Sequence, residues 1–101
     1  MKQDVFNQYV DRIVKIFGIQ KSELFIKSKK RDFVDARYLL YYLCANRPMN
    51  VSYIEKYMKQ NGYDTNHNTI IYGIASVEQR MQDDMDYVSI IKNLENTVFI
   101  I

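Results

Sequence analysis

A cluster of cations is the feature of this sequence best suited to binding a ligand. Four of the five residues from 27 to 31 are basic, and Arg37 follows six residues later. Fixed cations of this kind attract a phosphate backbone, because each one that neutralises a phosphate releases condensed counterions. A solvated charged turn is the simpler interpretation, since basic surface patches are common. The cations of the cluster are Lys27, Lys29, Lys30 and Arg31.

The charge of the chain is unevenly distributed. The net charge is +2, but residues 1–62 carry twelve Lys or Arg and six Asp or Glu, a balance of +6. Residues 63–101 carry two basic and six acidic residues, a balance of −4. A polyanion would therefore be expected to bind the N-terminal two thirds of the molecule.

The residues that usually perform catalysis or hold metals are scarce. His67 is the only histidine and Cys44 the only cysteine, and they belong to different predicted helices. A structural zinc site would need further ligands, and a nucleophile–base pair would need the fold to bring these two together. We therefore expect no enzymatic activity, no cofactor, no metal and no small-molecule substrate.

Length and composition predict one all-α domain over residues 1–101. Three Gly and one Pro in 101 residues are too few for the many turns of an all-β fold. One cysteine cannot form an internal disulfide, and neither a cleavable signal peptide nor an apolar run long enough to span a membrane is present. These observations favour a cytoplasmic protein with no membrane partner.

Apolar periodicity predicts about six helices. The first covers residues 3–17 and stops at Gly18, and a short second helix is capped by Ser22. Asp32 is expected to cap a central, buried helix over 33–46, and Asn50 a fourth. A fifth helix spans about 66–82, and a last one follows an acidic break at 83–86. The predicted inward stripe of the fifth helix is Ile70, Ile71, Ile74, Val77 and Met81.

Two helices joined by a polar turn, following a buried third, indicate a Trp-repressor-like helix-turn-helix. In such folds the first residues of the second helix meet base edges in the major groove. Here these residues can all form hydrogen bonds, but several are also good N-caps, so the local pattern fits plain capping equally well. Tyr72, one turn farther on, is expected either to pack on a sugar or thymine methyl or simply to be exposed. The first residues of the helix are Asn66, His67, Asn68 and Thr69.

The same segments resemble the C-terminal DNA-binding domain of the bacterial replication initiator DnaA, over roughly residues 5–97. That family has a Lys/Arg-rich loop before its central helix and a second helix that opens like Asp-His-Thr-Thr with two aliphatic residues. The corresponding stretches here are Ser28-Lys29-Lys30-Arg31 and Asn66-His67-Asn68-Thr69-Ile70-Ile71. The upstream runs Val14-Lys15-Ile16-Phe17-Gly18-Ile19 and Val34-Asp35-Ala36-Arg37 are also similar to the family.

The resemblance implies a stand-alone domain that binds double-stranded DNA with sequence preference, in replication initiation or its regulation. The basic loop (Lys27, Lys29, Lys30 and Arg31) would take phosphates or the minor groove, and Arg37 a phosphate. His67, Asn68 and Thr69 would read bases or clamp the backbone, with Asn66 in place of the family's Asp.

Departures from the family pattern keep a second function open. Asp35 replaces an arginine of the family, and the turn before His67 is about four residues longer. The C-terminal residues 98–101 are apolar and would either fold back or cover a partner surface. The alternative is therefore a protein–protein interaction module that regulates a replication or transcription protein without binding DNA. The oligomeric state is not predicted.

Overall fold

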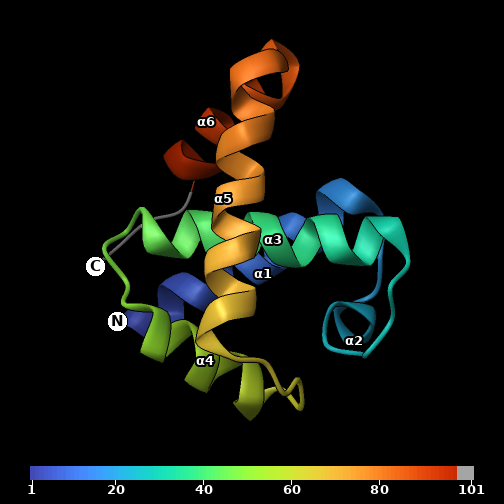
Figure 1. Cartoon of the computed structure of the whole chain (residues 1–101), viewed down its shortest axis with the longest axis vertical. Helices are drawn as coiled ribbons and strands as arrows, with labels where there is room; N and C mark the ends of the chain where they lie inside the picture. The colour runs from blue at the N-terminus through green and yellow to red at the C-terminus, as the bar shows by residue number, and fades with distance from the viewer. Residues whose placement is uncertain (98–101) are drawn as a thin grey trace.

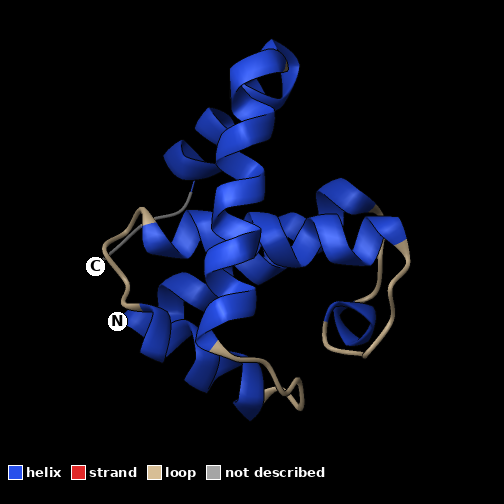
Figure 2. Cartoon of the chain, viewed as in Figure 1, coloured by secondary structure: helices blue, strands red, loops and turns tan. Residues whose placement is uncertain are grey.

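The computed structural model describes residues 1–97, and this part of the chain is all-α, as predicted (Figure 2). The expectation for the apolar residues 98–101 lies outside the described residues. The helices of the described part are α1 (Lys2–Phe17), α2 (Lys21–Leu24), α3 (Arg31–Ala45), α4 (Val51–Gln60), α5 (His67–Asp83) and α6 (Met85–Thr97).

The central helix α3 organises the molecule. It packs against α1 on one side and α5 on the other, and α5 crosses it in the view of Figure 1. The predicted burial of α3 is confirmed: eight of its residues are buried, among them Cys44 at the centre of the core. The helix α4 lies at the start of α5, and α6 packs back along the end of α5.

Local signals explain most helix ends. Gly18 adopts φ 63°, and its N–H and that of Ile19 bond back to the last turn of α1, so the predicted glycine stop is confirmed. Asn50 stands at the predicted N-cap position of α4. Asn66 caps α5 with its side chain, because its Oδ1 accepts from Thr69 N at 2.9 Å.

Three other predicted boundaries were wrong. Ser22 lies inside α2, whose first turn is closed by Gln20 N donating to the Glu23 carboxylate at 2.7 Å. Asp32 lies in the first turn of α3, which begins after Lys30. The acidic break before α6 is a single residue, Asp84, whose Oδ1 accepts from Tyr87 N at 3.0 Å. Helix boundaries assigned from sequence spacing alone commonly differ from the observed ones by one or two residues.

The crossing of α3 and α5 depends on Gly73. A Cβ atom at this position would lie 2.7 Å from Tyr38 Cδ1, closer than packed atoms come, and 3.0 Å from Tyr41 Cδ2, which is a tight contact. The glycine therefore makes room for the tyrosine rings of α3 to pack directly on the backbone of α5. Ile70 and Val77 are buried on the same face of α5, whereas Ile71 is 53% exposed, so its predicted inward position was wrong.

We expect Gly73→Ala to lower the free energy of unfolding. Alanine favours a helix over glycine by about 1 kcal/mol, but displacing two tyrosine rings costs about 1–3 kcal/mol, so the net loss should be on the order of 1 kcal/mol. Chemical denaturation of the variant measures it.

The double variant Gly73→Ala/Tyr38→Ala is the matched control. Without the Tyr38 ring, alanine at 73 should be neutral or stabilising relative to Tyr38→Ala alone. An equal penalty in both backgrounds would contradict the crossing argument.

Candidate nucleic-acid interface

The basic loop between α2 and α3 is held in place from beneath by Arg37. The guanidinium donates from Nη1 to the carbonyl oxygens of Leu24 at 3.3 Å and Ile26 at 3.2 Å, and from Nη2 to that of Ser28 at 2.7 Å. The Arg37 residue is only 4% exposed. Buried carbonyl groups need donors, and a planar guanidinium can satisfy several at once. The path of residues 24–28 is therefore set by a side chain of α3.

This arrangement corrects the expectation that Arg37 contacts phosphate. Its hydrogen-bonding nitrogens are used inside the protein, so it positions the loop and does not project from it. The sequence carried a clue, because Phe33, Arg37 and Tyr41 repeat at four-residue spacing and all three are buried. A charged residue on the inward stripe of a helix is usually paired within the protein.

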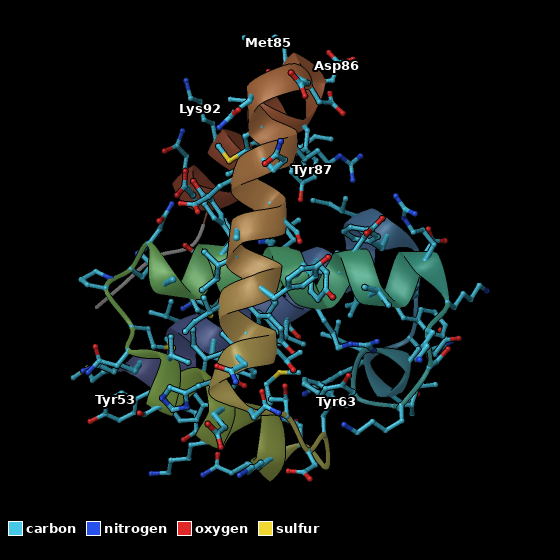
Figure 3. All side chains as sticks on the ribbon, in the orientation of Figure 1. Tyr53, Tyr63, Met85, Asp86, Tyr87 and Lys92 are labelled. Atoms are coloured by element: carbon cyan, nitrogen blue, oxygen red, sulfur yellow. The ribbon has the colours of Figure 1, made fainter. Side chains whose placement is uncertain are left out.

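The loop also docks on the turn that precedes α5. Lys27 Nζ donates to the carbonyl oxygen of Asp64. The Nζ of Lys27 lies 4.4 Å, and the guanidinium carbon of Arg37 4.8 Å, from the centre of the Tyr63 ring, within the range of cation–π attraction. Sequence reasoning missed Tyr63, which Figure 3 labels beside the start of α5. An aromatic residue after Asn61–Gly62 was its only local signal.

A hollow of about 330 Å³ separates the loop from the first turn of α5. Lys29 from the loop and Thr69 from α5 both line it, so two elements expected to contact nucleic acid adjoin one another. The remaining lining residues come from the loop, α3 and the turn before α5, and are Lys27, Ser28, Val34, Arg37, Tyr38, Tyr41 and Tyr63.

The cations of the loop differ in their surroundings. Lys29 and Lys30 are exposed, and Lys30 Nζ lies 5.2 Å from the centre of the Phe33 ring. Arg31 is also exposed, but its Nε lies 3.4 Å from a carboxylate oxygen of Asp35. Asp35 therefore lowers the positive potential at Arg31 and leaves that of Lys29 and Lys30 less affected.

The start of α5 presents its expected residues to solvent. Asn66, Asn68 and Thr69 are exposed, and Tyr72 is 65% exposed with its ring set edge-on to Tyr38 at 6.0 Å. The side-chain oxygen of Asn66 nevertheless accepts the capping hydrogen bond from Thr69 N. Capping is therefore performed by Asn66, and Asn68 remains exposed beyond the cap.

His67 belongs to a small polar cluster with α4. Its Nδ1 lies 2.8 Å from Glu55 Oε1, and its Nε2 lies 3.4 Å from Ser52 Oγ. Lys59 Nζ donates to the other Glu55 oxygen at 2.9 Å. The hydrogen bonds from Lys59 and then His67 hold the pKa of Glu55 below its ordinary value of 4.5. A carboxylate therefore stands beside the histidine expected to meet DNA, which sequence reasoning had not foreseen.

The described residues contain little that points to other chemistry. Burial raises the pKa of the Cys44 thiol well above its ordinary value, which leaves the thiol protonated within the core. Across residues 1–97, His, Cys, Asp and Glu side chains do not gather into groups of three that could hold a metal ion. Within the same range, every helix is too short or too polar to cross a membrane. No protein-family model matches the chain, and no solved structure does either.

Arg37→Met should lower the free energy of unfolding by about 3–5 kcal/mol, because three partly or fully buried carbonyl groups lose a charged donor. Hydrogen exchange should accelerate in residues 25–30 before it does in α1 or α3. Both are measurable in the full chain, by denaturation and by exchange mass spectrometry.

The matched control is Arg31→Met, which removes the same charge from a side chain that is 88% exposed. It should change stability by less than about 0.5–1 kcal/mol. Equal losses in the two variants would show that Arg37 does not hold the loop.

The pairing of Glu55 with Lys59 and His67 predicts that the stability of the fold depends on pH. Because its folded-state pKa is lowered, the pairing stabilises the fold above the ordinary pKa of 4.5, and this contribution is lost as the pH falls through the lowered value. In an NMR titration Glu55 should protonate below pH 4.5, and Lys59→Met should move its midpoint upward. An unchanged midpoint in Lys59→Met would contradict the pairing of Lys59 with Glu55.

Proposed function

We propose that this chain binds double-stranded DNA with a sequence preference. The basic loop takes phosphates at the edge of the minor groove, and the first turns of α5 enter the major groove. The observation that carries this proposal is the hollow that Lys29 and Thr69 line together. It brings the densest cation cluster of the chain next to the exposed start of a helix whose first residues form hydrogen bonds.

A fixed loop favours this function over a flexible basic tail. Arg37 and Tyr63 hold the loop before any ligand arrives, so little conformational entropy is lost when phosphate binds. The start of α5 adds unpaired backbone N–H groups, which are natural partners for phosphate oxygens. The two elements are separated by one hollow, so a single duplex could contact both.

The distribution of charge agrees with phosphate binding at the basic loop. The excess of cations falls in residues 1–62, which contain the loop, and the acidic excess falls in residues 63–101. In Figure 3 the acidic region around Asp86 lies at the opposite end of the molecule from Tyr63. The resemblance to the C-terminal DNA-binding domain of DnaA supports a role in replication initiation or its regulation.

A protein-binding module is the second candidate function. It is favoured by the groove between α1 and α6, where Ile16 is 51% and Ile90 41% exposed. Apolar side chains exposed beside a groove are common at protein interfaces. Lys15 and Asn93 also line this groove, which does not involve the basic loop or the start of α5.

Fluorescence anisotropy with a random-sequence duplex, titrated at two salt concentrations, tests the proposal. We expect binding that weakens steeply with salt, as counterion release requires. Lys29→Ala/Lys30→Ala should weaken binding to all duplexes and reduce the slope of log Kd against log salt by about 2, one for each lost phosphate contact.

Lys92→Ala is the control for charge alone. Lys92 is exposed on α6, at the other end of the molecule from Tyr63 (Figure 3), and its loss should leave the salt slope unchanged. Absence of binding even at low salt would refute the proposal. The groove of Ile16 and Ile90 would then be the surface to test for a protein partner.

A further inference from the structure

The first three turns and more of α5, through Gln79, carry no Lys or Arg. Residues 66–79 include neither Lys nor Arg. The next cation, Arg80, is occupied within the protein, because its Nε lies 3.6 Å from Asp84 and its guanidinium 4.1 Å from the centre of the Tyr87 ring. Arginine and lysine are the side chains that most often read guanine, through its O6 and N7. Residues 66–79 therefore lack the side chains that most often read guanine.

Apart from the hydroxyl of Thr69 and the carboxylate of Glu78, the exposed side chains of residues 68–79 are of two chemical types. Asn68 and Gln79 are amides, which can donate to N7 and accept from N6 of adenine. Ile71, Tyr72 and Ala75 offer carbon atoms, which suit the methyl group of thymine. Ile71 is exposed and does not contribute to the core. On a face that contacts bases, its side chain would pack on a thymine methyl group.

We propose that the base pairs beneath α5 are A·T pairs, so that the preferred target of this chain is an A·T-rich duplex. This inference rests on the proposed DNA binding and specifies its substrate. The stretch from Asn68 to Ala75 rises about 10 Å along the helix, which corresponds to about three base pairs. Asn68 reads adenine at one end of that stretch, and Ile71, Tyr72 and Ala75 pack on thymine methyls.

The basic loop favours the same target for a separate reason. A·T tracts have a narrow minor groove with a more negative potential, which attracts Lys and Arg. Lys29 and Lys30 are exposed cations of the loop, whereas the exposed Arg31 is paired with Asp35. A narrow groove beside the major-groove contact of α5 would therefore strengthen binding at the loop as well.

The test compares two duplexes of equal length and identical ends, one with an A·T-rich centre and one with a G·C-rich centre, by anisotropy at low salt. We expect the A·T-rich duplex to bind at least about tenfold more tightly, because each unfavourable base pair in a site typically weakens binding by a factor of about five or more. Equal binding, or preference for G·C, overturns this inference and leaves the proposed DNA binding intact. Binding to neither duplex refutes the proposed function itself.

Substitutions on α5 test whether this face is the source of the preference for A·T pairs. Asn68→Ala and Tyr72→Ala should each lower the ratio of A·T to G·C affinity several-fold, while affinity for the G·C duplex stays nearly constant. Circular dichroism verifies that both variants fold. An unchanged ratio in both variants would show that α5 is not the reading element.

A gain of guanine reading provides the opposite test. Ala75→Arg places a cation on the reading face, and it should raise affinity for the G·C duplex more than for the A·T duplex. The control Ser89→Arg adds the same charge at an exposed position on α6. It should leave the affinity ratio as it is, and the assignment fails if the two variants change the ratio equally.

Discussion

The candidate interface depends on one buried side chain. Arg37 lies on the central helix, and its guanidinium joins the carbonyl groups of Leu24, Ile26 and Ser28. A charge with so little exposure is tolerated only when its donors are paired, which the loop carbonyls provide. These hydrogen bonds also fix the backbone path of the loop, whose cations repel one another. The core therefore positions a surface that it could not otherwise order.

A second constraint joins that surface to the next element. Gly73 allows α5 to lie close on α3, beneath the rings of Tyr38 and Tyr41. This crossing sets the start of α5 beside the loop that Arg37 holds, and Tyr63 completes the contact between them. Since both constraints act through α3, the loop and α5 keep their relative placement as long as the core is intact.

Local charge pairs modulate the surface. Asp35 reduces the potential at Arg31, and Glu55 stands between Lys59 and His67 at the start of α5. Each carboxylate opposes a close approach of phosphate at its own position. The positive potential is therefore concentrated at the middle of the loop, and residues 66–79 of α5 contain no Lys or Arg. In the proposed binding mode, the loop would attract phosphates and the helix would discriminate between bases.

The sequence by itself determined the helices and most of the core. Apolar periodicity, scarce Gly and Pro, and the stop at Gly18 act within a few residues, so they predicted an all-α fold, with errors only at caps such as Asp32. The tertiary structure alone decided which polar residues face inward and which meet. Arg37 is buried and bonds to the loop, Ile71 is exposed, and Tyr63 contacts Lys27 of the loop. The sequence did not predict these three outcomes, because they depend on contacts between segments far apart in the chain. Helical spacing describes one helix at a time and carries no information on what packs against it.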